Sequence, residues 1–129
     1  KVGCIIINSN KHVLGMGYNG FPQGCNDEDK PKKRPFKYPY MVHAEENAIS
    51  NMVYKPDRDK LTAYVTHYPC NSCVKLLWQN NIYHIVVPEG KKVHGFSHDD
   101  QLIYDFLIQN GLEMEEIKFD FSFLKNQDG

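Results

Sequence analysis

The segment Pro69-Cys70-Asn71-Ser72-Cys73, with the apolar residues that follow it, decides the fold of this 129-residue chain. Its two cysteines stand three positions apart at the head of an apolar stretch. This spacing predicts a helix over residues 70–79 with both sulfur atoms on one face. Short apolar runs at 61–66 and 82–87 flank this helix and predict buried strands. A strand, a helix and a strand in this order are typical of a domain in which helices pack on a central sheet.

The same alternation continues on both sides of this unit. The pattern predicts a hairpin of two strands at 2–8 and 12–18. It also predicts a helix from 43 to about 52, a further helix at 99–109 and a last strand at 112–117. Residues 19–39 are predicted to form a long loop, and the tail from residue 118 is left unassigned. Loops of this length inside a compact domain tend to be functional. We therefore expect one α/β domain over residues 1–129.

The composition limits the classes of partner. Fifteen Lys and Arg residues against 16 Asp and Glu residues give a net charge of −1, so the chain has no global field for nucleic acid or for an anionic membrane. The longest aliphatic run, residues 4–7, is far shorter than the ~20 apolar residues of a spanning helix. Two of the four cysteines have metal-ligand spacing, which indicates a reducing compartment, the cytosol or the nucleus.

A second motif, His43-Ala44-Glu45, begins the first predicted helix. If the helices that begin at His43 and Cys70 lie side by side, His43 completes a His/Cys/Cys set with Cys70 and Cys73. Three protein ligands leave the fourth position to water, which is the arrangement of a catalytic Zn²⁺ site. Glu45 is placed near such an ion without ligating it, as a proton shuttle.

The alternative is a closed structural zinc site with a fourth protein ligand, for which Cys4, Cys25 and His67 are the candidates. That alternative leaves Glu45 without a role. The two motifs together match H-x-E…P-C-x-x-C, the signature of zinc deaminases. In that chemistry, activated water attacks C4 of a pyrimidine while the glutamate protonates ring nitrogen N3 and then the departing amine.

At these motifs the chain resembles the deoxycytidylate (dCMP) deaminase family of the zinc-dependent cytidine deaminase superfamily. The resemblance spans residues 2 to about 87, with a weaker match to 117. Its pieces are Val2-Gly3-Cys4-Ile5-Ile6, the stretch from Gly17-Tyr18-Asn19-Gly20 to Asn26-Asp27, Lys37-Tyr38-Pro39-Tyr40, His43 to Ile49, and Pro69 to Cys73. Similarity to the cytidine and dCMP deaminase domain-containing branch implies dCTP as the alternative substrate.

The resemblance implies a three-layer α/β/α domain with a central five-stranded mixed sheet, and a helix before the first strand that is missing from this chain. It implies Zn²⁺ held by His43, Cys70 and Cys73, with Glu45 as the catalytic acid and base. It implies a homo-oligomer with dCTP and dTTP as effectors. The residues that it assigns to ligands are Asn19, Ala44 and Tyr68 for the substrate, and Tyr18, Gly20 and Lys37 for a phosphate or an effector.

Two other functions stay open at this point. A polynucleotide deaminase needs a basic, aromatic-rich groove to bind its substrate. The near-neutral net charge and the single Trp of this chain argue against that function. A non-catalytic zinc scaffold would bind the ion without turnover. The basic segment 30–37 fits nucleotide phosphates, a nuclear address or a solvated loop. His94 and His98 fit a second metal site or an ordinary surface pair.

Overall fold

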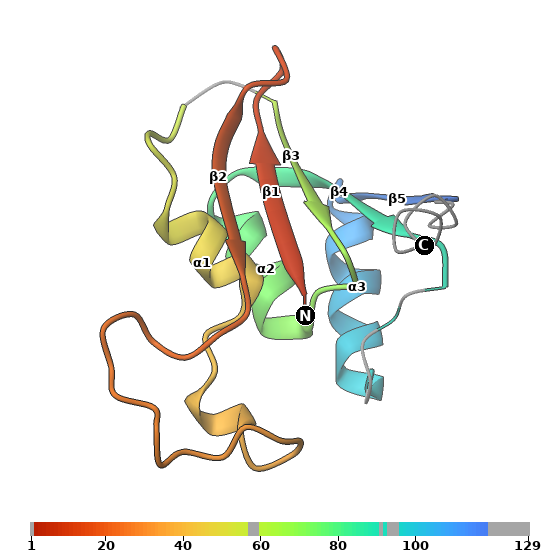
Figure 1. Cartoon of the computed structure of the whole chain (residues 1–129). Helices are drawn as coiled ribbons and strands as arrows, with labels where there is room; N and C mark the ends of the chain where they lie inside the picture. Colours follow the sequence, from red (N-terminus) through yellow and green to blue (C-terminus); the bar gives the residue numbers. More distant parts are fainter. Residues whose placement is uncertain (1, 57–59, 91, 93–95, 119–129) are drawn as a thin grey trace, which may run out of the picture.

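The computed structural model of the chain describes residues 2–56, 60–90, 92 and 96–118 (Figure 1). The strands are β1 (Gly3–Ile7), β2 (Val13–Tyr18), β3 (Leu61–Val65), β4 (Ile82–Pro88) and β5 (Glu113–Ile117). The helices are α1 (Ala44–Ser50), α2 (Asn71–Gln79), α3 (His98–Gln109) and the short 3-10 helix η1 (Tyr38–Tyr40). Among the described residues, no helix has the length and apolar character needed to cross a membrane.

The five strands form one mixed sheet in the order β2-β1-β3-β4-β5. β1 runs antiparallel to both β2 and β3, whereas β3 and β4, and β4 and β5, are parallel. The predicted hairpin and the predicted five-stranded mixed sheet are therefore confirmed. Each parallel connection carries a helix across the sheet, as such connections require.

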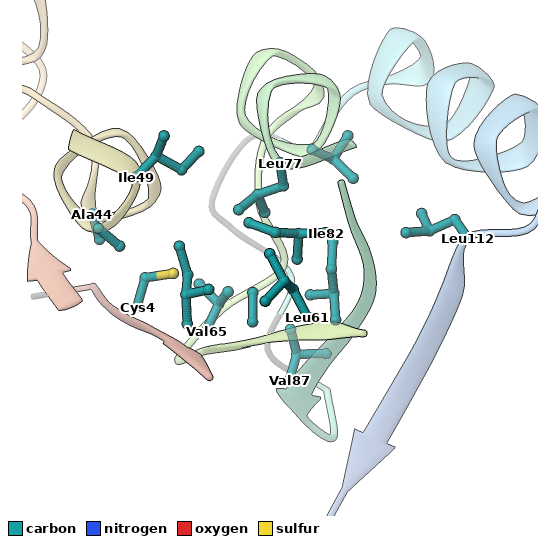
Figure 2. Close-up of a cluster of buried hydrophobic side chains, with 14 of the residues drawn as sticks. Cys4, Ala44, Ile49, Leu61, Val65, Leu77, Ile82, Val87 and Leu112 are labelled. Carbon is teal, nitrogen blue, oxygen red and sulfur yellow. The ribbon is translucent and has the colours of Figure 1, made fainter. Parts of the chain in front are cut away.

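All three α-helices lie on one face of this sheet. Strand register places Gly17, Cys4 and Val65 side by side on that face. In Figure 2 the labelled side chains of α1 and α2 point toward those of β1, β3 and β4. The opposite face carries the exposed apolar side chains of Ile5 and Tyr64. The described residues thus form two of the three expected layers, a sheet and one layer of helices.

The core lies between these two layers. Ile6, Leu77 and Ile85 are fully buried, and Tyr104 and Leu107 of α3 join the same cluster. Cys4 is buried in this cluster too, which confirms its expected role as a small core residue. Trp78 packs against the cluster from its edge, as predicted. The core fixes how α1 and α2 sit on the sheet.

Helix α1 packs unusually close to the edge strand β2. A Cβ atom added at Gly17 would lie 2.6 Å from the backbone nitrogen of Ala48 and 2.6 Å from Cβ of Asn47. Only a glycine leaves room for this approach. Along the same edge, Asn47 Nδ2 donates to the carbonyl oxygen of Tyr18 at 2.8 Å, and Asn51 Nδ2 donates to that of Met16 at 3.0 Å. The helix that begins next to His43 is therefore seated in one register on the sheet.

The predicted boundaries differ from the structure in small ways that capping explains. His43 and Cys70 have extended backbones and are N-caps, so α1 and α2 begin one residue later than predicted, whereas Ser97 is the N-cap of α3, which begins at His98, one residue earlier than predicted. The long loop before α1 contains η1, and its end at Val42 pairs with Gly20. In Figure 1 this loop extends away from the sheet. The predicted pair partner His94, and the tail beyond residue 118, lie outside the described residues.

Candidate metal centre

The N-termini of α1 and α2 bring the three predicted metal ligands together. His43 caps α1, Cys70 caps α2, and Cys73 lies in the first turn of α2. The ligand atoms of these three side chains all lie within 4.8 Å of one another. His43 Nδ1 is 3.2 Å from Cys73 Sγ and 3.7 Å from Cys70 Sγ. Residues 27 and 30 positions apart in sequence thus converge on one point.

These distances fit a zinc ion. Zn–N and Zn–S bonds of about 2.1 and 2.3 Å in tetrahedral geometry place the nitrogen and sulfur ligands about 3.6 Å apart. The observed separations of 3.2 and 3.7 Å bracket this value. The donor set, one imidazole and two thiols, is one that Zn²⁺ prefers. The set has three members among the described residues, which leaves a fourth tetrahedral position.

The protons of the site are shared among the ligands. A hydrogen bond with Cys73, with His43 as a further contributor, lowers the pKa of Cys70 to about 4. The hydrogen bond between His43 and Cys70 raises the pKa of His43, and the separate hydrogen bond between Cys73 and Cys70 raises the pKa of Cys73. The lowered pKa favours the thiolate form of Cys70, which lies at a helix N-terminus that also favours negative charge. A bound cation takes the place of the shared protons.

Glu45 lies beside this set but outside it. Its side chain is buried, with 3% of the residue exposed, and it hydrogen-bonds with Cys73. Burial is the largest cause of the raised pKa of Glu45, and the hydrogen bond with Cys73 opposes it. A buried carboxyl group with a raised pKa is suited to proton transfer.

The described residues do not form a closed structural zinc site, because none of the three candidates for a fourth protein ligand joins the group. Cys4 is in the core, Cys25 is exposed in the loop, and His67 Nδ1 lies 3.2 Å from Thr66 Oγ1. None of these three belongs to the group formed by His43 and the two cysteines. Burial raises the pKa of Cys4 to about 12, which keeps it a thiol.

The predicted substrate residues have mixed surroundings. Asn19 Oδ1 accepts from the backbone nitrogen of Val2 at 2.8 Å, so this oxygen ties the loop to β1. Ala44 is buried as the first residue of α1, directly beside the metal ligands. Tyr68 donates to Glu116 and packs edge-on against Phe96, and burial, then Glu116, raises its pKa to about 12.

The predicted effector residues meet in one hollow. Tyr18, Gly20 and Lys37 all line a cavity of about 420 Å³ whose walls are formed by the long loop itself and the end of β2. In the basic segment, Lys30 pairs with Asp29 at 3.9 Å, and Lys32 pairs with Asp27 at 3.4 Å. Both lysines therefore form ion pairs with aspartates of the same loop.

The sequence analysis missed two residues of α3 that hold the segment around Cys70. Tyr104 Oη donates to the carbonyl oxygen of Pro69 at 2.7 Å, and Asp100 accepts from the backbone nitrogen of Asn71 at 2.7 Å. A Ser97-x-x-Asp100 capping box is visible in the sequence. It predicts the start of a helix, but not the contact with Asn71.

Fold and site together define a class: a cytidine deaminase-like α/β domain with a His/Cys/Cys zinc site. Comparison with known proteins agrees. The family model "Cytidine and deoxycytidylate deaminase zinc-binding region" matches residues 1–89. The chain belongs to this family, the cytidine and deoxycytidylate deaminases.

Its relatives include deoxycytidylate deaminases. Human deoxycytidylate deaminase is 40% identical over 97 residues, which are 70% of this chain and 54% of that protein. The uncharacterised deaminase of the luxG 3' region of Aliivibrio fischeri is 31% identical, covering 93% of this chain and 81% of its own. The dCMP deaminase of cyanophage S-TIM5, solved with dCMP and dUMP, is 30% identical with a TM-score of 0.60, covering 91% and 81%. The chain thus spans about half (54%) of the human protein.

Proposed function

We propose that this domain hydrolyses the exocyclic amine of a cytosine deoxynucleotide, converting dCMP and water to dUMP and ammonia. The observation that carries the proposal is the buried carboxyl group of Glu45 beside the His43, Cys70 and Cys73 group. Family membership supports it, and so does the cyanophage dCMP deaminase, whose structure contains dCMP and dUMP. A structural zinc site has no need of such a carboxyl group.

His43, Cys70 and Cys73 would hold Zn²⁺, which supplies the Lewis acidity that makes water a nucleophile at neutral pH. Glu45 would accept a proton from the attacking water and deliver it to N3 of the pyrimidine as the new C4–O bond forms. The carboxylate then takes the remaining proton of the added water from the C4 hydroxyl group and passes it to the amine, the C4–N bond breaks to leave a C4 carbonyl, and ammonia leaves. A raised pKa lets Glu45 serve both as base and as acid in one turnover.

In this proposal the substrate contacts are made by Ala44, Asn19 and Tyr68, the residues that the family resemblance implies. The backbone of Ala44 would help to hold the ring, since it lies between His43 and Glu45. The oxygen of Asn19 is engaged by Val2, so its contact with a nucleotide would be made by its amide nitrogen. Tyr68 would contact the substrate from the residue before Pro69.

A panel of cytosine compounds tests the proposal. The purified domain with zinc is incubated with dCMP, dCTP, cytidine and a cytosine-containing oligonucleotide, and ammonia and uracil product are measured. We expect turnover of dCMP, with dCTP as the alternative within the same family. Turnover of the oligonucleotide alone, or of none of the four, contradicts the proposal.

The variant Glu45→Ala separates an enzyme from a zinc scaffold. We expect activity to fall by about 10²–10⁴-fold, which is the usual contribution of an acid–base group. Zinc content and the circular dichroism spectrum should stay unchanged. Glu113→Ala, at an exposed glutamate of β5, is the matched control and should keep full activity. Equal activity of Glu45→Ala and the control would show that Glu45 has no catalytic role.

We also propose that the cavity lined by Tyr18, Gly20 and Lys37 takes an effector nucleotide, with dCTP or dTTP as candidates, in a homo-oligomer. The cavity volume of about 420 Å³ and the two lysines that line it, Lys32 and Lys37, support a phosphate-bearing ligand. The dCMP assay repeated with each triphosphate tests this, and an unchanged rate with both counts against it.

A further inference from the structure

Helix α3 holds the turn that carries Cys70 from both sides. On one side, Tyr104 Oη donates to the carbonyl oxygen of Pro69 at 2.7 Å. On the other side, Asp100 Oδ1 accepts from the backbone nitrogen of Asn71 at 2.7 Å and from Asn71 Nδ2 at 2.9 Å. The residue between these two anchors is Cys70. No metal ligand lies on α3 among the described residues, so the helix supplies no donor atom to the ion itself.

Both anchoring side chains are almost fully buried. Tyr104 is 2% exposed and Asp100 is 5% exposed. The second oxygen of Asp100 accepts from the backbone nitrogen of Ser97 at 2.7 Å and from Ser97 Oγ at 3.0 Å. One carboxylate thus joins the first turn of α2 to the N-cap of α3 through four hydrogen bonds. Such a buried and saturated group cannot move without breaking several bonds.

The backbone of Cys70 needs support of this kind. As the N-cap of α2, Cys70 has an extended backbone, φ −67° and ψ 170°, and it joins the hydrogen bonding of the helix only through its carbonyl oxygen, which accepts from the backbone nitrogen of Val74 at 2.9 Å. Cys73 lies within α2, so its position follows from the helix itself. A tetrahedral zinc site tolerates errors of only a few tenths of an ångström in its ligand atoms. Of the two thiol ligands, Cys70 is therefore the one whose position depends on other elements.

We propose that Asp100 and Tyr104 are positioning residues for the zinc site, which hold the Pro69–Asn71 turn so that Cys70 Sγ meets the ion. The proposal rests on the His43, Cys70 and Cys73 site described above. It adds that part of the zinc affinity resides in α3, a helix that supplies no ligand. Partners of this kind typically contribute about 10–100-fold to metal affinity or activity.

Two conservative variants test the proposal. Asp100→Asn keeps the shape but turns one acceptor into an amide donor, which then faces the donors of either Ser97 or Asn71. Tyr104→Phe keeps the ring and removes the hydroxyl that bonds Pro69. Zinc affinity is measured by competition with a chromophoric chelator, and Co²⁺ is substituted to record the thiolate charge-transfer band. We expect each variant to lose about 10–100-fold in zinc affinity and to shift the Co²⁺ spectrum.

Matched controls come from the same chain. Asp105→Asn changes an exposed aspartate on the same helix, which bonds Gln101, and Tyr83→Phe removes a hydroxyl that bonds Asn81 at the surface. Both controls should bind zinc like the wild type. Circular dichroism and the unfolding midpoint of the metal-free proteins are measured alongside. A purely structural role would lower those midpoints and leave zinc affinity and the Co²⁺ spectrum unchanged, which would overturn the proposal.

The readout also separates this inference from the proposed reaction. Zinc affinity needs no substrate, so a protein that deaminates none of the tested compounds but loses zinc in Asp100→Asn and Tyr104→Phe still supports the inference. If Asp100→Asn does not fold, Tyr104→Phe decides alone. A wild-type protein that binds neither zinc nor Co²⁺ overturns the inference together with the site.

Discussion

Two carboxyl groups, those of Glu45 and Asp100, are buried among the residues that the structure describes. Their surroundings shift their pKa values in opposite directions. For Glu45, burial is the dominant cause and the pKa is raised. For Asp100, burial also raises the pKa, but the hydrogen bonds from Ser97 and Asn71 together outweigh it, and the net pKa is lowered. The carboxyl group whose pKa is raised by burial suits proton transfer, and the one with four hydrogen-bond donors suits a fixed support.

The sequence predicted the first of these carboxylates but not the second. Glu45 lies two residues from His43, so the local motif His43-Ala44-Glu45 was enough to predict that Glu45 belongs to the site. Asp100 meets Asn71 across a separation of 29 residues, and no spacing rule within one helix reveals such a contact. Long-range partners of this kind emerge only from the packing of α2 against α3.

The lowered pKa of Asp100 predicts an acid-dependent loss of stability. Because its folded pKa lies below the ordinary value of 3.8, its contribution is fully present above that value and is lost as pH falls through the folded pKa. In metal-free protein we expect Asp100→Asn to be about 1.5–3 kcal/mol less stable than wild type near pH 6. This difference should shrink below about pH 4.

Urea unfolding of metal-free protein at a series of pH values measures this. Other groups titrate alike in both proteins, so they cancel in the difference. Asp105→Asn is the control, for which we expect a small difference that does not vary with pH. A wild-type advantage that stays constant down to pH 2 would mean that the charge of Asp100 plays no part.

At the scale of elements, the site depends on how α1 lies on β2. The sequence predicted both elements from apolar spacing and turn residues. It did not predict their close contact, because a strand glycine such as Gly17 is compatible with a bulge, a bend or a nearby backbone. The structure shows the last of these, with α1 backbone atoms against the strand. The N-terminus of α1, with His43 and Glu45, is located by that contact.

A methyl group at this contact should therefore displace the helix. We expect Gly17→Ala to lower the free energy of unfolding by about 1–3 kcal/mol, as overpacking commonly does, and to weaken zinc binding by moving His43. Urea denaturation and chelator competition are the measurements.

Gly3→Ala is the matched control on the neighbouring strand. Its added Cβ would lie 3.8 Å from Thr66 Cγ2, an ordinary contact, so we expect no loss of stability. Equal unfolding midpoints for Gly3→Ala and Gly17→Ala would contradict the packing argument.

For the molecule as a whole, the order of strands and helices followed from the sequence, and the placement of layers did not. Periodicity assigns each element a buried side, but it does not say which face of the sheet a helix covers. The three helices share one face because Cys4, Ala63 and Ile85 lie on it together, next to α1, α2 and α3. That common face also lets two helix N-termini meet at one ion.

Zinc removal should affect the whole domain, since the ion would tie α1 to α2. We expect a chelator to lower the Tm and added zinc to restore it, with about 2.7 kcal/mol of stabilisation when free zinc is 100 times the Kd. Differential scanning calorimetry with and without zinc measures this. Cys73→Ser lacks one ligand and should show little response. An identical Tm for metal-free and zinc-loaded wild type would argue against a site shared by two helices.

The two amides that α1 lays along β2 have a consequence beyond the site. An exposed edge strand offers unpaired backbone groups to which a strand of another molecule can add, a common route to aggregation. Asn47 and Asn51 occupy two carbonyl groups on one outer edge of the sheet. On the other outer strand, β5, three glutamates at 113, 115 and 116 would face like charges in a second copy. These features disfavour strand addition between two copies of the domain. At the β2 edge, the protection comes from the same helix, α1, that begins beside His43.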